Sequence, residues 1–381
     1  MISPEIFILG LFFSQKSMEI HKKNSKFVSQ KQLNMAKTKA QEVAATSKFQ
    51  EALDKLNKAY GEGTVLTLNS KTDGHYDVIS TGSIGFDFIT LGTGGFVKGK
   101  MYELMGWEGS GKSTICGHAV AECQKKGGTV LYIDGEHAVD KKYFEAIGVD
   151  TTKMLIAQPT CGEEGFQIAM DMINTGTIDL IIIDSDSSLI PKKVLDGDVG
   201  DSSIGKKALL NSNAYPKLKG ALSQHNVCVI VISQYREKIG MMFGNPTTTQ
   251  GGHALKFYTD CRIEVSKSLA KEGDVNYGNI TKVKAIKNKM SPPYRLHSFD
   301  IVYGVGIDKV GEIMELINEY SLGRKYGQTM TFNDIKYNLD QFKQMLIDNK
   351  NGFYDDIRET IVNKINQVEI KIEENEPIIE D

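Results

Sequence analysis

A glycine-rich run in the first third of the chain constrains the fold more than any other segment. The residues Gly106-Trp107-Glu108-Gly109-Ser110-Gly111-Lys112-Ser113 match the pattern G-x-x-x-x-G-K-[ST] at every fixed position. Residues 101–105 before them are typical of a short buried strand, and residues 114–125 after them are typical of a helix. A loop between two such elements directs its backbone N–H groups and the positive end of the helix dipole at a phosphate. The alternative is a glycine-rich turn that only starts a helix, and the Lys-Ser pair argues against it.

This pattern predicts a site for a nucleoside triphosphate. We expect ATP to contact the loop residues 106–113 and Thr114, with Lys112 at the β- and γ-phosphates. The hydroxyl of Ser113 is the expected protein ligand of a Mg²⁺ ion.

Apolar, β-branched runs recur between residues 78 and 308 and alternate with helical stretches. The runs cover residues 101–105, 129–133, 178–183, 227–233, 261–265 and 281–286. This alternation predicts an α/β fold in which a central sheet, parallel for at least its central strands, is flanked by helices. Ligands of such sheets bind at the carboxyl ends of the strands.

Polar side chains stand at the ends of three of these runs. Glu136 lies three residues after the run 129–133, Asp184 directly follows the run 178–183, and Gln234 directly follows the run 227–233. In phosphate-loop ATPases an acidic strand end holds Mg²⁺, directly or through water, and a second polar group positions the attacking water. We expect Asp184 in the first role, Glu136 as the carboxylate that polarises water, and Gln234 as a neutral sensor of the γ-phosphate. Acidic residues at strand ends also commonly start loops without any catalytic role. The catalytic interpretation of Glu136 and Asp184 therefore depends on the phosphate-binding loop in the same chain.

Two glycine-rich segments separate these elements. The longer, over residues 235–252, carries basic residues, hydroxyls and an apolar tip, which suit phosphate contacts and stacking on unpaired bases. The other, over residues 194–205, carries Asp196, Asp198 and Asp201 beside its glycines. Its spacing alone favours a flexible hinge.

Length and composition exclude several classes of protein. A chain of 381 residues is longer than the range in which a single hydrophobic core keeps growing. We therefore expect one large domain with one or two small ones. Its longest apolar stretch, residues 6–13, is too short to span a bilayer and lacks the flanks of a secretion signal. The five cysteines are odd in number and form no C-x-x-C pair, which is typical of reduced thiols. We therefore expect a cytoplasmic protein without a membrane partner.

Taken in order, these segments resemble the bacterial RecA recombinases, which are ATP-dependent DNA strand-exchange proteins. The resemblance runs from about residue 49 to about residue 322. Its most specific runs are S-T-G-S at 80–83, D-G-E-H-A at 134–138, I-G-M-M-F-G-N-P at 239–246, G-G-H-A-L-K-F-Y at 251–258 and K-N-K at 287–289. It implies a RecA-type P-loop ATPase core with a mostly parallel central sheet over residues 71–308.

The resemblance also implies roles that the spacing leaves open. Asp140, Tyr143 and Tyr303 would flank the adenine, and Gln234 would couple the γ-phosphate to the longer loop. Lys287 and Lys289 would enter the ATP site of the neighbouring subunit, where their charges would act as an arginine finger does. Both glycine-rich segments would be DNA-binding loops. Their expected DNA contacts are Ile204, Lys206 and Lys207 in the first, and Arg236, Lys238, Phe243, Asn245, Thr249, Gly251 and Gly252 in the second.

Four positions depart from the family pattern. Trp107 and Gly109 stand where RecA proteins usually carry Pro and Ser, but neither position supplies the lysine or the hydroxyl that binds nucleotide. Leu209 replaces a basic residue near the first DNA loop, and His253 replaces an Asn beside the second. We expect rearranged DNA contacts rather than loss of ATP binding.

The parts outside the core carry weaker signals. Residues 1–34 are expected to be a disordered extension, either upstream of a natural start at Met35 or a regulatory arm. Residues 35–70 include an amphipathic helix over 47–60, which packs on its own core or, as the resemblance implies, forms a helix-strand oligomerisation element with an adjacent protomer. Residues 309–367 are expected to be a small C-terminal domain, α/β or helical. Residues 368–381 hold six acids against one lysine and are expected to be a disordered acidic tail, which competes with DNA or only solubilises the chain.

The resemblance therefore implies an ATP- and Mg²⁺-dependent enzyme of recombination and DNA repair. It would form a helical homo-oligomeric filament on single-stranded DNA, pair that strand with homologous double-stranded DNA and exchange strands while hydrolysing ATP. A head-to-tail contact that does not close propagates in this way. The sequence does not decide whether a repressor of the LexA type is a further partner in the DNA-damage (SOS) response. The alternatives are a RecA-fold hexameric helicase and a nucleotide-gated DNA-binding scaffold without turnover.

Overall fold

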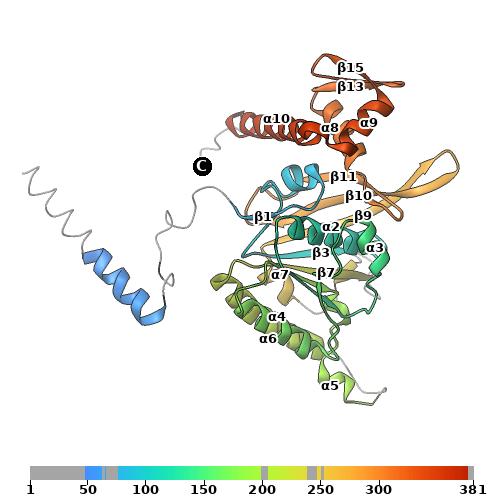
Figure 1. Ribbon diagram of the computed structural model, residues 1–381. Coiled ribbons are helices and arrows are strands. Elements are labelled where there is room, and N and C mark those ends of the chain that lie inside the picture. The colour runs from blue at the N-terminus through green and yellow to red at the C-terminus, as the bar shows by residue number, and fades with distance from the viewer. Residues whose placement is uncertain are drawn as a thin grey trace, which may run out of the picture. The chain divides into compact units, whose positions relative to one another are not determined.

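The computed structural model describes residues 48–61, 65, 76–198, 205–237, 247–249 and 253–375 (Figure 1). The chain divides into two compact units, Met1–His75 and Tyr76–Asp381. In the first unit the described residues form a helix over 48–60, and the Asn57 side chain binds both backbone groups of Val65. The expected extension over 1–34 and the expected strand of the oligomerisation element lie outside the described residues.

The second unit is built on a large sheet. Its parallel part runs in the order β9-β3-β7-β6-β4-β5, and the antiparallel strands β10, β11 and β12 continue it beyond β9. The strands are β3 (Met101–Gly106), β4 (Val130–Asp134), β5 (Leu155–Ala157), β6 (Leu180–Asp184), β7 (Cys228–Glu237), β9 (Cys261–Glu272), β10 (Val275–Asn288), β11 (Leu296–Val302) and β12 (Gly306–Ile307). A short strand, β8 (Thr247–Thr249), pairs with the end of β7, and β1 (Val78–Ile79) pairs with β2 (Phe96–Val97). The prediction of an α/β fold with a mostly parallel central sheet is confirmed.

Helices cover both faces of this sheet, and successive strand residues supply two cores (Figure 1). In β6, Leu180 and Ile182 pack beneath α2 (Lys112–Lys125) and α3 (Lys141–Ala146), whereas Ile181 and Ile183 pack beneath α4 (Gly162–Asn174) and α6 (Lys206–Gln224). Because successive side chains of a strand point to opposite faces, a strand covered on both sides is apolar throughout. Two short helices, α5 (Lys192–Leu195) and α7 (Ala254–Tyr258), and two single turns, η2 (Phe86–Thr90) and η3 (Asp186–Ser188), complete this part.

Every predicted strand is present, but three are longer than predicted. β7 continues past its predicted end at residue 233 to Glu237. β9 and β10 extend into a long antiparallel hairpin whose outer part carries mostly exposed side chains. The predicted runs 261–265 and 281–286 cover only the parts buried in the core, because the prediction followed apolar residues.

The elements that follow β12 pack around a third cluster of buried apolar side chains. These elements are α8 (Lys309–Glu319), the antiparallel strands β13 (Gly323–Tyr326), β14 (Thr329–Phe332) and β15 (Ile335–Asn338), α9 (Leu339–Asp348), the turn η4 (Lys350–Gly352) and α10 (Phe353–Asn375). The residues between 309 and 367 are thus α/β rather than purely helical. No helix in the described parts of the chain is long and apolar enough to cross a membrane.

The helix α10 corrects the expectation of a disordered tail from residue 368. It continues through Asn375, because residues 368–375 include three Glu and one Lys, which favour a helix, and no Gly or Pro occurs before Pro377. Residues 376–381 lie outside the described part.

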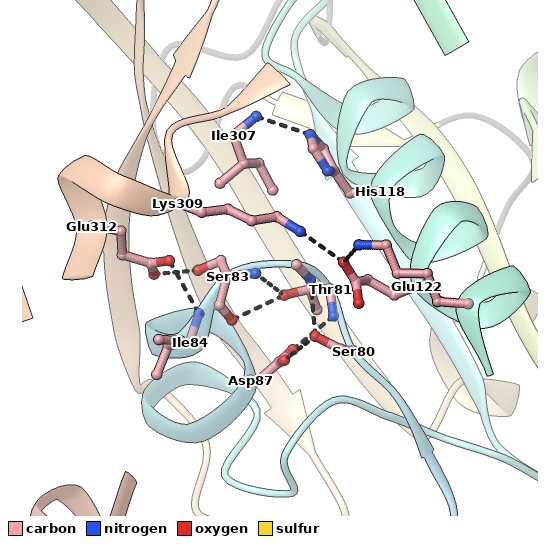
Figure 2. Close-up of polar contacts among 12 residues, drawn as sticks. Ser80, Thr81, Ser83, Ile84, Asp87, His118, Glu122, Ile307, Lys309 and Glu312 are labelled. Carbon is pink, nitrogen blue, oxygen red and sulfur yellow. Dashed lines mark hydrogen bonds and ion pairs between the residues drawn. The ribbon is translucent and has the colours of Figure 1, made fainter. Parts of the chain in front are cut away.

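Polar contacts bind α8 to the core around the S-T-G-S run at 80–83 (Figure 2). The Glu312 carboxylate accepts hydrogen bonds from the Ser83 hydroxyl and from the backbone N–H groups of Ile84 and Gly85. Lys309 pairs with Glu122 of α2 at 2.7 Å, and the backbone N–H of Ile307 donates to His118 of the same helix at 2.9 Å. The helix that follows the phosphate-binding loop is therefore tied directly to the start of α8.

Candidate nucleotide-binding site

The glycine-rich loop joins β3 to α2, as predicted. Gly109 and Gly111 adopt φ angles of 66° and 97°, which side chains disfavour, and a Cβ on Gly111 would lie 2.6 Å from Ile301 Cδ1. The buried Lys112 ammonium donates to the carbonyls of Gly106 at 3.0 Å and Trp107 at 2.7 Å. Burial lowers the pKa of Lys112, although Asp184 and Glu136 oppose this effect. The loop thus curls around a single buried cation.

Asp184 meets two hydroxyl groups at the end of β6. Its Oδ2 accepts from Ser113 Oγ at 2.8 Å and from Tyr132 Oη at 2.6 Å. Burial raises the pKa of Asp184, while these two hydrogen bonds act in the opposite direction. Burial also raises the pKa of Tyr132 well above its ordinary value, so this phenol stays a donor. Sequence reasoning paired Ser113 with Asp184 but missed Tyr132, because a tyrosine inside an apolar strand carries no distinctive signal.

Glu136 and Gln234 come together across the ends of two strands. Gln234 Nε2 donates to Glu136 Oε1 at 2.7 Å, and Ser185 Oγ donates to the same oxygen at 2.5 Å. Gln234 is paired in register with Gly106, the first residue of the loop. The carboxyl ends of β3, β4, β6 and β7 therefore bring the predicted loop, carboxylates and amide to one place.

These groups surround a cleft of about 310 Å³. Its lining is Glu108, Gly109, Gly111, Lys112, Ser113, Thr114, Glu136, Tyr143, Asp184, Ile232, Gln234, Asn279, Ile301, Tyr303 and Gly304. Tyr143 bonds to Thr114 at 2.9 Å, and Tyr303, which is 53% exposed, donates to Asn279 at 3.3 Å. Two tyrosine rings in the lining suit an aromatic base, and the phosphate loop lies in the same cleft.

Asp140 does not line this cleft but caps α3. Its carboxylate accepts from the backbone N–H groups of Lys142 at 2.8 Å and Tyr143 at 3.3 Å. Its contribution in the single chain is to start the helix that carries Tyr143.

Lys287 and Lys289 lie away from the cleft of their own chain, at the end of β10. Lys287 Nζ donates to the Lys256 carbonyl at 2.7 Å, near the end of α7, and Lys289 Nζ lies 3.7 Å from Asp260 Oδ1. Burial lowers the pKa of Lys287, and the neighbouring Lys289 and Arg262 act in the same direction.

The predicted DNA contacts divide into three groups. Lys206 begins α6, and Arg236 and Thr249 belong to the paired strands β7 and β8, so the strand that carries Gln234 leads directly into the second loop. Lys207 instead turns inward, donating to the Leu189 carbonyl at 2.8 Å and lying 3.3 Å from Asp186, and burial lowers its pKa. The other predicted contacts lie outside the described residues: Ile204, Lys238, Phe243, Asn245, Gly251 and Gly252.

Trp107 contributes a contact that the sequence did not suggest. Its ring meets Tyr235, which follows Gln234, edge to face at 6.0 Å between centroids. The phosphate loop therefore contacts the start of the glycine-rich segment 235–252 through an aromatic pair.

Comparison with known proteins identifies the family. The model of the RecA N-terminal domain matches residues 47–308. Protein RecA of Cytophaga hutchinsonii is 46% identical over 305 residues, which cover 79% of this chain and 86% of the relative. Protein RecA of Clostridioides difficile is 45% identical over 302 residues, covering 78% and 86%. Protein RecA of Porphyromonas gingivalis strain W83 is 42% identical over 339 residues, covering 87% and 99%.

The chain belongs to the RecA family. As a member of this family it is a DNA-dependent ATPase of homologous recombination and DNA repair, which binds ATP and DNA and forms filaments. The helicase and the inactive scaffold are not favoured by this relationship.

Proposed function

We propose that the cleft binds Mg²⁺-ATP, that Glu136 activates the water that attacks the γ-phosphate, and that Gln234 transmits the state of the nucleotide to the second DNA loop. The hydrogen bond of 2.7 Å between Glu136 and Gln234 carries this proposal. It joins the carboxylate that would orient water to the strand that leads into the loop, inside a cleft that also contains Lys112.

The oxygen donors at the cleft suit Mg²⁺. The Ser113 hydroxyl and the Asp184 carboxylate are hard ligands, and Mg²⁺ is usually held by one or two such groups together with substrate phosphates. Among the described residues no cluster of three or more His, Cys, Asp or Glu side chains forms a complete metal site, in keeping with a metal that depends on phosphates. The bound ion would neutralise charge on the β- and γ-phosphates.

The residues then act as follows. Lys112 would exchange its hydrogen bonds to loop carbonyls for the β- and γ-phosphates. Ser185 fixes one oxygen of Glu136, so the carboxylate can hold a water molecule in line with the γ-phosphorus and accept its proton. When ATP is bound, the Gln234 amide would donate its hydrogen bond to the γ-phosphate instead of Glu136, and after hydrolysis it would return to Glu136. The affinity for DNA would therefore depend on the bound nucleotide.

A neighbouring copy would complete the site. Lys287 and Lys289 do not line the cleft of their own chain, which supports the proposal that they reach the ATP of the adjacent protomer in a helical filament. Residues 35–70 would dock on that protomer. ATP would thereby lie at the subunit contact.

The two loops would bind single-stranded DNA along the filament and pair it with a homologous duplex. Arg236 and Thr249 support the second loop as a contact, because Arg236 follows Gln234 on β7 and Thr249 lies on β8, which pairs with β7. Lys206 remains the better candidate of the two lysines near the first loop. We assign Lys207 to holding Asp186 instead, because its ammonium is occupied inside the protein.

Two finer assignments follow from the family. A filament of this kind would act in the bacterial cytoplasm, where the chromosome lies, and the five free cysteines suit that compartment. A repressor of the LexA type is proposed as a partner in the SOS response. Cleavage of a purified repressor in the presence of this protein, ATP and single-stranded DNA would test it.

Hydrolysis assays on Glu136→Gln test the proposed mechanism. The variant should bind ATP but lose about a hundredfold or more of the DNA-stimulated rate, because the amide cannot accept a proton. Gln234→Ala should keep nucleotide binding and lose stimulation by DNA. Wild-type hydrolysis rates in Glu136→Gln would contradict the assignment.

A further inference from the structure

The phenol of Tyr132 contacts the nucleotide site from behind. It is 1% exposed, lies in the middle of β4 and is absent from the cleft lining. Its hydroxyl donates to Asp184 Oδ2 at 2.6 Å. Tyr132 therefore contacts the proposed metal-binding carboxylate from outside the cleft.

The two carboxylate oxygens of Asp184 differ in their hydrogen bonds. Oδ2 receives both the Tyr132 hydroxyl and the Ser113 hydroxyl, and among the described residues no hydrogen bond reaches Oδ1. A carboxylate rotates freely about its last bond unless donors fix it. Two donors on one oxygen fix that rotation and leave the other oxygen to bind the ion or one of its waters.

The ring of Tyr132 is itself held firmly. It packs edge to face on Phe144 of α3 at 5.5 Å between centroids, inside the core beneath α2 and α3. Phe144 is adjacent in sequence to Tyr143, which lines the cleft. The donor therefore comes from a rigid side chain, which makes it able to orient its partner.

We propose that Tyr132 is a positioning residue that sets the Asp184 carboxylate for Mg²⁺. The inference rests on the proposed function, in which Asp184 helps to hold the ion. It adds a buried tyrosine that controls the affinity for metal rather than for nucleotide.

Tyr132→Phe isolates the hydroxyl, because the ring and its packing remain. Tyr215→Phe is a matched control, since Tyr215 is also fully buried and donates at 2.6 Å to a buried aspartate, Asp186, that does not line the cleft. Both variants lose one phenol-carboxylate hydrogen bond, so they should lose similar stability. Only Tyr132→Phe should change the response to metal.

The measurement uses the full chain without DNA. Trp107, the only tryptophan, lies in the phosphate loop, so energy transfer from it to N-methylanthraniloyl-ADP reports nucleotide in this site alone. Titration with MgCl₂ gives the concentration for half-maximal binding. We expect it to rise about tenfold in Tyr132→Phe and to stay at the wild-type value in Tyr215→Phe. Nucleotide affinity in EDTA should change less than about twofold in either variant.

The possible results distinguish failure of the proposed metal site from failure of the positioning role of Tyr132. If the wild-type chain binds nucleotide without any response to Mg²⁺, the proposed function fails at its metal site. If the wild type responds and Tyr132→Phe matches Tyr215→Phe, or binds Mg²⁺ more tightly, the positioning role of Tyr132 is overturned. An equal loss of affinity with and without Mg²⁺ would also overturn it, because that result indicates general damage to the cleft.

Discussion

The Glu312 carboxylate provides a quantitative test of how the C-terminal elements are held to the ATPase core. It is buried and accepts from Ser83 Oγ at 2.5 Å, from the Gly85 N–H at 3.0 Å and from the Ile84 N–H at 3.1 Å, and His297 Nε2 lies 3.0 Å from it. Glu312→Gln keeps the shape of this side chain. It converts one of the two acceptor oxygens into a donor.

The loss of stability in Glu312→Gln follows from the backbone N–H groups of Ile84 and Gly85. The Gly85 N–H points at Oε1 and the Ile84 N–H points at Oε2, so either orientation of the amide leaves one backbone N–H facing an NH₂ group. Unlike the hydroxyl of Ser83, a backbone N–H cannot change from donor to acceptor. Loss of a bond to a charged acceptor with a buried N–H left unpaired should cost about 2 to 4 kcal/mol.

Urea unfolding followed by circular dichroism measures this cost. Glu319→Gln is the control, because Glu319 lies on the same helix but is exposed, and it should change the free energy of unfolding by less than about 0.5 kcal/mol. If Glu312→Gln is as stable as Glu319→Gln, the carboxylate does not hold α8 to the core and the reasoning is refuted.

Two further predictions concern pH and the subunit contact. Burial raises the pKa of Asp87 from 3.8 to about 7, so the folded protein keeps a proton that the unfolded chain releases. Between those pKa values the free energy of unfolding should therefore fall as pH rises, by up to about 1.4 kcal/mol per pH unit, and urea titrations of Asp87→Asn should show a flatter pH dependence. Mixing Lys287→Ala with Glu136→Gln should restore roughly one quarter of the DNA-stimulated ATPase activity, because random assembly leaves that share of contacts with both groups intact. No recovery in filaments that still form would show that Lys287 does not act in trans.

The phosphate-binding part of the site could be predicted in detail. The glycine pattern requires a strand before it and a helix after it, and β3 and α2 occupy those positions. Asp184, Glu136 and Gln234 were expected to meet because carboxyl ends of parallel strands share one edge of a sheet. Their convergence in one cleft follows from that topology.

Contacts that depend on side-chain direction could not be predicted. Tyr132 reads as one more large residue of a buried strand, and nothing in its spacing indicates that its hydroxyl reaches Asp184. Lys207 reads as a surface cation beside a glycine-rich loop, yet the buried Asp186 draws it inward. Both cases are set by partners distant in sequence.

The ends of several helices and strands could also not be predicted from the sequence pattern. The hairpin of β9 and β10 extends past its buried part, where backbone pairing rather than apolar side chains maintains the strands. Conversely, the acidic charge after residue 367 suggested disorder, but helix-forming residues continue α10 to Asn375.

Single-stranded DNA binding with and without nucleotide tests the central claim most directly. The anisotropy of a labelled oligonucleotide should report an affinity about tenfold or more higher with Mg²⁺ and a non-hydrolysable ATP analogue than without them, because Gln234 links the cleft to the second loop. Lys112→Ala should show no such gain. Equal affinity of the wild-type protein under both conditions would contradict the account.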